Sequence, residues 1–147
     1  MRHPKLRGAF ASRGVIAATL ASALIAITAS VATACDTAPY SHNGSRMEVH
    51  ACDGRLVISY DIPRSGLVKA GVRPGTILFE GLYEELTGGA SLSGHARLFN
   101  HRCGPIRYAV NGWMEGNSIV MEGMAPIRNA GCTINGRRTD ILQFRGL

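Results

Sequence analysis

The sequence has little that predicts a helical protein. After residue 34, no segment keeps its apolar residues at the 3.6-residue spacing of an amphipathic helix. The chain also has no internal repeat and no low-complexity segment, so a repeat architecture is not expected. The fold is instead expected to come from short segments in which apolar and polar residues alternate.

The motifs of common catalytic and metal sites are also missing. No C-x-x-C or H-x-x-x-H spacing is present for zinc, and no G-x-S-x-G surrounds a serine nucleophile. The adjacent carboxylates Glu84 and Glu85 would point to opposite faces of a strand. The histidines after residue 34 are scattered and show no ligand spacing: His42, His50, His95 and His101. We therefore expect no catalytic residues, no metal and no cofactor, and a protein that is not an enzyme.

The charge of the chain does not point to nucleic acid. Of the 16 Lys and Arg residues, four lie in the first 34 residues, where none of the 10 Asp and Glu residues lies. Residues 35–147 therefore carry 12 basic and 10 acidic residues, a net charge of +2 and not the +6 of the whole chain. Aromatic residues make up only 6% of the sequence, which leaves few rings to stack on bases. We expect no nucleic-acid partner.

One long uncharged segment, residues 14–34, is present, and it follows a basic start. The four cations of that start are Arg2, Lys5, Arg7 and Arg13. The segment ends with Ala32-Thr33-Ala34, small residues of the kind that signal peptidase requires. We predict a signal peptide over residues 1–34 and a single domain over residues 35–147, with no membrane span after cleavage. An uncleaved membrane anchor is the alternative, because the segment is long enough to cross a bilayer.

All four cysteines follow the predicted cleavage site: Cys35, Cys52, Cys103 and Cys132. An even number in a short exported chain predicts two disulfides. Of the three connectivities, we favour Cys35–Cys52 and Cys103–Cys132, because each joins neighbours in the sequence. Lipidation of Cys35 and a structural zinc site are the alternatives. The predicted compartment is the periplasm or the outside of the cell.

The alternating segments predict an all-β fold. Met47, Val49 and Ala51 alternate with polar residues, and the next run, residues 56–60, alternates Leu56, Ile58 and Tyr60 with Val57 and Ser59. Asp53-Gly54 between the two runs predicts a tight hairpin. Further strands are expected near residues 76–80, 90–100, 106–111, 118–124, 132–135 and 141–144, with loops at 36–45 and 63–75 and a turn at 136–140. Seven to eight short strands at this spacing predict a small antiparallel β-barrel or sandwich. Gly94 predicts a bulge or a close backbone approach within its strand.

Several blocks resemble a family of short exported alphaproteobacterial proteins of unknown function. These blocks are SHNGSRM (residues 41–47), PRSGL (63–67), GVRPGTILFEG (71–81) and RCGP (102–105). The resemblance extends over nearly all of residues 35–147. It implies an envelope location in a bacterium and the Cys103–Cys132 pairing, and it implies no particular activity.

Residues 63–75 form the most informative polar segment. Arg64, Lys69 and Arg73 lie on it, between two prolines, and we predict that they bind an anionic ligand or partner. In the alternative interpretation, Arg64 and Arg73 brace the loop through Asp61, Glu80 and backbone carbonyls. A single helical turn is expected at residues 67–70.

Together these features predict a monomeric, non-catalytic envelope module whose partner is an envelope protein or an anionic ligand. A periplasmic inhibitor of lysozyme-type hydrolases is the first alternative, because Cys52-Asp53-Gly54 resembles a turn of such inhibitors. A small hydrolase is the second alternative.

Overall fold

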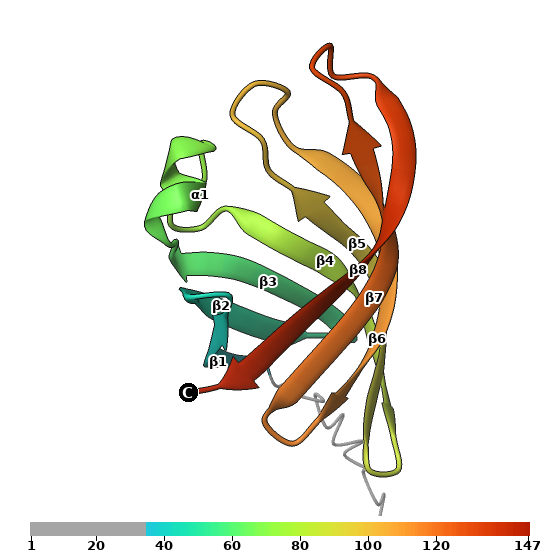
Figure 1. The fold of residues 1–147 in the computed structure, drawn as a ribbon. Helices are drawn as coiled ribbons and strands as arrows, with labels where there is room; N and C mark the ends of the chain where they lie inside the picture. Colours follow the sequence, from blue (N-terminus) through green and yellow to red (C-terminus); the bar gives the residue numbers. More distant parts are fainter. Residues whose placement is uncertain (1–34) are drawn as a thin grey trace, which may run out of the picture. The chain divides into compact units, whose positions relative to one another are not determined.

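Residues 35–147 form a closed antiparallel β-barrel in the computed structural model, which describes these residues (Figure 1). The predicted signal peptide therefore lies outside the described residues. The elements are β1 (Asp36–His42), β2 (Ser45–Cys52), β3 (Arg55–Ile62), α1 (Ser65–Lys69), β4 (Ile77–Leu86), β5 (Gly89–Leu98), β6 (Ile106–Glu115), β7 (Ser118–Arg128) and β8 (Ile134–Gly146). Each strand pairs with the next, and β8 pairs with β1. The predicted all-β fold is confirmed as an eight-stranded barrel.

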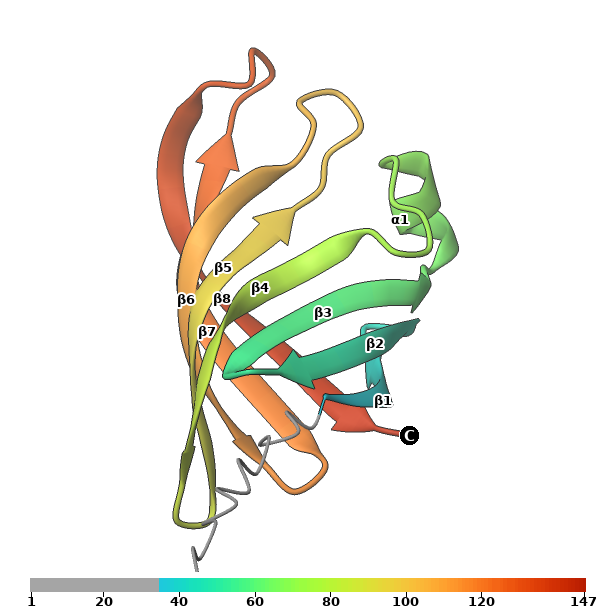
Figure 2. The same cartoon turned by 180° about the vertical axis from the view of Figure 1, so that it is seen from behind.

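The up-and-down order places the connections at two ends. The β1–β2, β3–β4, β5–β6 and β7–β8 connections share one end, which we call the α1 end because α1 lies there. The other three connections are tight turns at the opposite end, and the two views from front and back agree on this division (Figures 1 and 2). No helix among residues 35–147 is long and apolar enough to cross a bilayer.

Local residue choice explains the predicted hairpin and helical turn. Asp53 and Gly54 both adopt positive φ, 52° and 70°, as a type I′ turn requires. The short helix α1 begins at Ser65, two residues before the start of the helical turn predicted at residues 67–70. It ends at Lys69, one residue before the end of that predicted turn. Both predictions are confirmed.

Two segments that the sequence analysis assigned to loops or turns are strands. Residues 36–42, predicted as a loop, form β1 and pair with β2 from Asp36↔Ala51 to His42↔Ser45. Its first four residues are exposed, so no apolar alternation marks it. Residues 136–140, predicted as a turn, lie inside β8, which pairs with β7 without interruption from residue 136 to residue 145. These predictions are wrong because cross-strand pairing, and not local apolar pattern, holds both segments extended.

Inward side chains fill the barrel. The largest of those that are fully buried are Phe79, Phe144, Met47, Leu56, Ile58, Ile119, Met121, Val72 and Val110. An eight-stranded barrel has an interior just wide enough for such side chains, or for one small ligand where they are absent.

Two glycines allow β4 and β5 to approach closely. Gly81 and Gly94 face each other in the ladder. A Cβ on Gly81 would lie 2.2 Å from the Ser93 carbonyl oxygen, and one on Gly94 would lie 2.4 Å from the Glu80 carbonyl oxygen. The predicted close backbone approach at Gly94 is therefore confirmed.

The β1–β8 seam is the shortest ladder of the barrel. Only Tyr40↔Gly146 and Ser41↔Arg145 pair across it. The Leu147 N–H donates to the Pro39 carbonyl at 3.1 Å, and the Ser41 hydroxyl donates to the Arg145 carbonyl at 3.3 Å. The barrel is therefore closed, but by far fewer contacts here than between β7 and β8.

Both predicted disulfides are present, Cys35–Cys52 and Cys103–Cys132. The sulfur of Cys35 is thus in a disulfide and not free for lipidation. Two disulfides place the domain in an oxidising compartment outside the cytoplasm.

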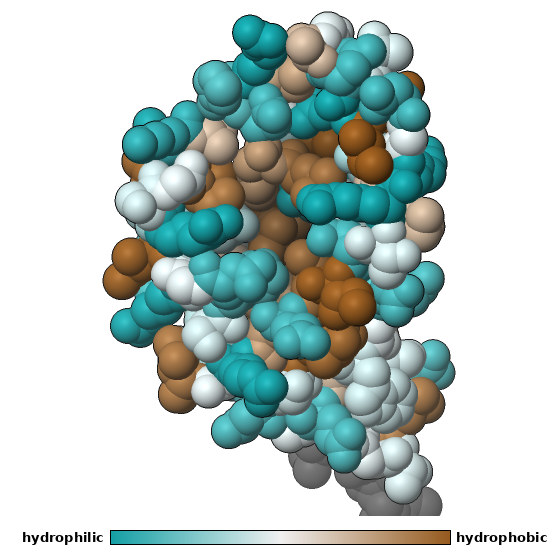
Figure 3. Space-filling view, viewed as in Figure 1, coloured by the Kyte–Doolittle hydropathy of each residue, from teal (hydrophilic) through white to brown (hydrophobic). Residues whose placement is uncertain are grey.

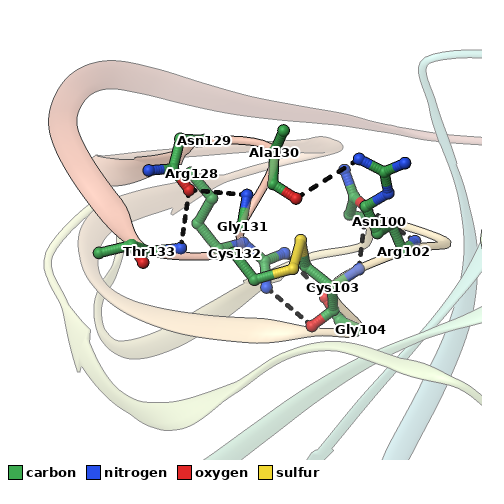
Figure 4. Close-up of a disulfide and its surroundings, with 10 residues drawn as sticks. All are labelled: Asn100, Arg102, Cys103, Gly104, Arg128, Asn129, Ala130, Gly131, Cys132 and Thr133. Atoms are coloured by element: carbon green, nitrogen blue, oxygen red, sulfur yellow. Dashed lines mark hydrogen bonds between the residues drawn. A yellow bond between two sulfur atoms is a disulfide. The ribbon is translucent and has the colours of Figure 1, made fainter.

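The Cys103–Cys132 disulfide joins the β5–β6 and β7–β8 loops of the α1 end (Figure 4). The Arg128 guanidinium donates to the carbonyls of Cys103 at 2.9 Å and Gly104 at 2.7 Å. The Asn129 side-chain oxygen accepts from the backbone of Gly131 and Thr133. These contacts fix the two loops relative to each other.

Candidate functional site

A cavity of about 260 Å³ opens at the α1 end of the barrel. Figure 3 shows this face hollowed between α1 and β8, hydrophobic in its depth and bordered largely by hydrophilic residues. Its lining comes from six strands, α1 and neighbouring loops: His42, Asn43, Tyr60, Arg64, Leu67, Leu78, Arg97, Leu98, Phe99, Tyr108, Arg138, Asp140 and Leu142.

The inner wall of the cavity is apolar. Leu78 and Leu142 are buried, and Leu67 of α1 packs against the core. The rings of Tyr60 and Phe99 meet edge to face at 5.9 Å. These side chains offer a ligand hydrophobic contact on several sides.

Two arginines of the lining carry no ion pair among the described residues: Arg64 and Arg138. Arg64 immediately precedes α1, and its backbone N–H donates to the buried Ser45 hydroxyl at 3.0 Å. Arg138 lies on β8. Both side chains are exposed and make no side-chain hydrogen bond within residues 35–147, so their guanidinium groups have donors available for an anion.

The two guanidinium groups act on tyrosines of the same cavity. Burial raises the pKa of Tyr60 to about 12, and the Arg64 cation opposes that rise. Burial also raises the pKa of Tyr108 well above its ordinary value, and Arg138 opposes that rise. Positive charge from the β3–β4 connection and from β8 therefore converges on one site.

Among the described lining residues Asp140 is the only carboxylate, and it already accepts a hydrogen bond. The Tyr108 hydroxyl donates a hydrogen bond to Asp140 Oδ2. This bond adds to burial in raising the pKa of Tyr108, so the phenol stays protonated at neutral pH. The pair fixes both side chains within the wall.

His42 is a structural member of the lining. Its ring stacks on Phe144 with centroids 4.5 Å apart. Its Nδ1 lies 2.8 Å from the Gln143 carbonyl, which can only accept, so Nδ1 carries a proton. Its Nε2 lies 3.2 Å from the Asn43 amide nitrogen. Burial lowers the pKa of His42 and outweighs the Gln143 hydrogen bond, which raises it.

The structure separates the three cations predicted as ligand-binding residues. Arg64 lines the cavity, whereas Lys69 and Arg73 do not. Arg73 donates to the carbonyls of Val68 and Val72, both at 2.9 Å, and so braces the loop as the alternative interpretation proposed. The predicted ion pairs do not form.

The carboxylates expected to form these pairs bind other arginines. Asp61 binds Arg46 at 2.8 Å. Glu80 binds Arg97 at 2.8 Å and Arg107 at 3.0 Å.

Sequence reasoning missed Tyr108, Arg138 and Asp140 as lining residues. A signal was available for the last two. Extending the buried alternation of Phe144 and Leu142 backward in steps of two reaches Asp140 and Arg138, on the inner face of the same strand. The predicted turn at residues 136–140 concealed this continuity.

Two other groups of residues are weaker candidates for a functional site. Cys35, His50 and Cys52 lie within 4.8 Å of one another, but both sulfurs are in a disulfide and are not thiolate ligands. A larger hollow of about 530 Å³ lies more openly on the outside of the barrel, over β4, β5 and β6. Glu80 in its lining is already neutralised by Arg97 and Arg107.

A scan against protein-family models finds no match, and searches of curated proteins and of solved structures find none either. The resemblance to exported alphaproteobacterial proteins therefore stays a hypothesis.

Proposed function

We propose that this protein is a non-catalytic, exported binding protein that takes a small amphipathic anion into the α1 end of its barrel. The periplasm or the cell exterior is the proposed location. The ligand class is a carboxylate, or a similar anion, attached to a short aliphatic chain or a single aromatic ring.

One observation carries the proposal: a cavity with an apolar inner wall has two exposed arginines in its lining, Arg64 and Arg138, that form no ion pair among residues 35–147. Carboxylates form strong charge-assisted hydrogen bonds with guanidinium groups. The volume of about 260 Å³ lies just under the usual range for ligand pockets, roughly 300–1,000 Å³, which favours a small ligand.

Binding without catalysis is supported by the state of the polar groups. His42 has a partner at each ring nitrogen, and Tyr108 is held protonated against Asp140. Among the described lining residues there is no serine or cysteine that could act as a nucleophile.

The hydrolase-inhibitor alternative uses the other end of the barrel. The Cys52-Asp53-Gly54 turn lies at the β2–β3 connection, away from the cavity. Variants of the two ends therefore separate the two functions, and a c-type lysozyme inhibition assay tests the alternative directly.

Isothermal titration calorimetry with octanoate tests the proposal, with octan-1-ol as the uncharged ligand of equal chain length. We expect octanoate to bind and octanol to bind more weakly. Arg64→Gln and Arg138→Gln should each weaken octanoate binding by roughly tenfold or more, because each removes a charge-assisted hydrogen bond worth about 1.5–3 kcal/mol.

The matched control is Arg145→Gln, which removes one positive charge at the opposite end of the barrel. It should leave octanoate affinity within about twofold of the original, a difference of less than about 0.5 kcal/mol. Equal affinity for octanoate in all three variants would reject the cavity as an anion site.

A further inference from the structure

Positive charge is concentrated at the α1 end of the barrel. Of the 12 Lys and Arg residues in 35–147, only Arg55 and Arg145 lie in the opposite half of their strands. The other ten lie in the α1 half or in its loops: Arg46, Arg64, Lys69, Arg73, Arg97, Arg102, Arg107, Arg128, Arg137 and Arg138.

Negative charge has the reverse distribution. Asp61 and Glu80 lie in the α1 half, and Asp140 lies at the midpoint of β8. Asp36, Asp53, Glu84, Glu85 and Glu115 lie toward the opposite end, with Glu48 and Glu122 near the middle of their strands. The net charge of +2 therefore conceals a strong charge asymmetry along the barrel.

Few of the cations at the α1 end are neutralised. Asp61 binds Arg46, and Glu80 binds Arg97 and Arg107. The remaining seven cations have no ion pair within residues 35–147: Arg64, Lys69, Arg73, Arg102, Arg128, Arg137 and Arg138. This end therefore attracts an extended anionic surface.

Aliphatic side chains protrude among these cations. Val68 on α1 is 40% exposed, and Ile134 beside the β7–β8 turn is 48% exposed. Ile62 at the end of β3 and Ile127 across from the same turn are also exposed. Protruding aliphatic residues beside basic residues suit a bilayer interface, where the first enter the acyl boundary and the second contact anionic headgroups.

The loops that carry these residues are held in place. The Cys103–Cys132 disulfide and the Arg128 hydrogen bonds fix the β5–β6 and β7–β8 connections, as Figure 4 shows, and Arg73 braces α1. A pre-formed surface loses less conformational entropy on binding.

We infer that the α1 end docks on an anionic lipid bilayer, with Val68 and Ile134 in the interface and the seven cations over the headgroups. A soluble polyanion would use the charges but would gain nothing from the aliphatic side chains. The docking stands without an occupied cavity. If the proposed function also holds, the cavity mouth faces the bilayer, from which an amphipathic anion enters.

Vesicle co-sedimentation tests the charge distribution. The vesicles are phosphatidylcholine alone, or phosphatidylcholine with about one third phosphatidylglycerol. Binding should require the anionic lipid and weaken as salt screens it. Lys69→Glu with Arg137→Glu should weaken binding by about tenfold or more, since each basic residue near the surface contributes about 1 kcal/mol.

The control pair is Arg55→Glu with Arg145→Glu, which makes the same change in net charge at the opposite end. It should bind nearly as tightly as the original protein. All forms are made from the same full coding sequence, so any contribution of residues 1–34 is common to them. Equal loss in both pairs would overturn a directed docking surface.

Serine substitutions separate a bilayer from a soluble polyanion. Val68→Ser with Ile134→Ser should weaken vesicle binding several-fold, whereas Leu82→Ser with Ile141→Ser, at more exposed positions on the barrel wall, should not. Unchanged vesicle binding by the first pair, together with tight binding to dextran sulfate, would assign the surface to soluble polyanions and overturn the lipid inference.

The single tryptophan reports the orientation. Trp113 lies on β6 near the opposite end, so brominated lipids should not quench its fluorescence. In a Trp113→Phe background, Val68→Trp should be quenched strongly. Quenching of Trp113 but not of the introduced tryptophan would reverse the orientation and reject the inference.

Discussion

At the scale of single residues, the sequence predicts the exposure of one histidine and not of another. The alternation of Val49 and Ala51 around His50 predicts that its side chain faces solvent, and His50 is indeed exposed and hydrogen-bonded to Thr37. His42 lies in a polar segment without such alternation, and only the closed barrel reveals that it is 7% exposed and stacked on Phe144. Sequence pattern locates a side chain only where apolar neighbours define a face.

His42 should make stability depend on pH. Its pKa in the folded protein lies below the ordinary value of 6.5, because burial disfavours the charged ring. The unfolded chain therefore binds more protons than the folded protein just below pH 6.5. The stability present above pH 6.5 should be lost as the pH falls through the folded pKa.

Urea denaturation across this pH range measures the effect. His42→Gln should flatten the dependence of the free energy of unfolding on pH in that window. His101→Gln, at an exposed position, should keep it. The same slope in His42→Gln as in the original protein would show that another group is responsible.

At the scale of elements, alternation found the middle of the barrel and both ends of β8, but it missed β1 and residues 136–140 of β8. Residues 47–60 were predicted as a hairpin because their apolar residues alternate. Met47, Val49, Leu56 and Ile58 are indeed buried, at every second position of their strands. In β1 only Tyr40 and His42 are buried, and the α1 half of β8 directs polar residues inward to the cavity. The polar side chains that line the cavity interrupt the apolar alternation of these strands. Of the lining residues, only Arg64 was therefore predicted from the sequence to bind a ligand.

The close approach of β4 and β5 should make Gly81 intolerant of substitution. Gly81→Ala would place a methyl group 2.2 Å from the Ser93 carbonyl oxygen, and the obstacle is backbone. We expect the free energy of unfolding to fall by about 2–4 kcal/mol, as measured by chemical denaturation.

Gly66→Ala is the comparison for this substitution. Gly66 lies in α1, and its nearest obstacle is the end of the flexible Arg64 side chain at 4.0 Å. Alanine favours helix over glycine by up to about 1 kcal/mol, so this variant should be no less stable than the original protein. Similar destabilisation by both substitutions would contradict the role assigned to the Gly81–Gly94 contact.

At the scale of the whole molecule, the barrel and both disulfides were predictable, whereas the charge asymmetry was not. Composition gives only the net charge, which is +2 for residues 35–147. The asymmetry appears once the up-and-down order assigns each strand end to one side of the barrel. The proposed docking on a membrane therefore depends on the order of the strands and not on a sequence motif.

Hydrogen–deuterium exchange should show an uneven barrel. Two residue pairs join β1 to β8, against eleven between β7 and β8. The Leu147 amide, which donates to the Pro39 carbonyl across this seam, should therefore exchange before amides in the middle of the β7–β8 ladder, because the seam opens with less loss of contact. Uniform protection across both ladders would show that the barrel opens only as one unit.

The short β1–β8 seam also affects how newly synthesised chains interact with one another while they fold. Its two strands are about as far apart in sequence as residues 35–147 allow, so loop-closure entropy makes their pairing late in folding. Until then each chain presents two open edges, and a neighbour offers the same partners as the chain's own ends. Crowded folding is thus expected to produce strand-exchanged dimers, in which β8 of one copy completes the cylinder of another.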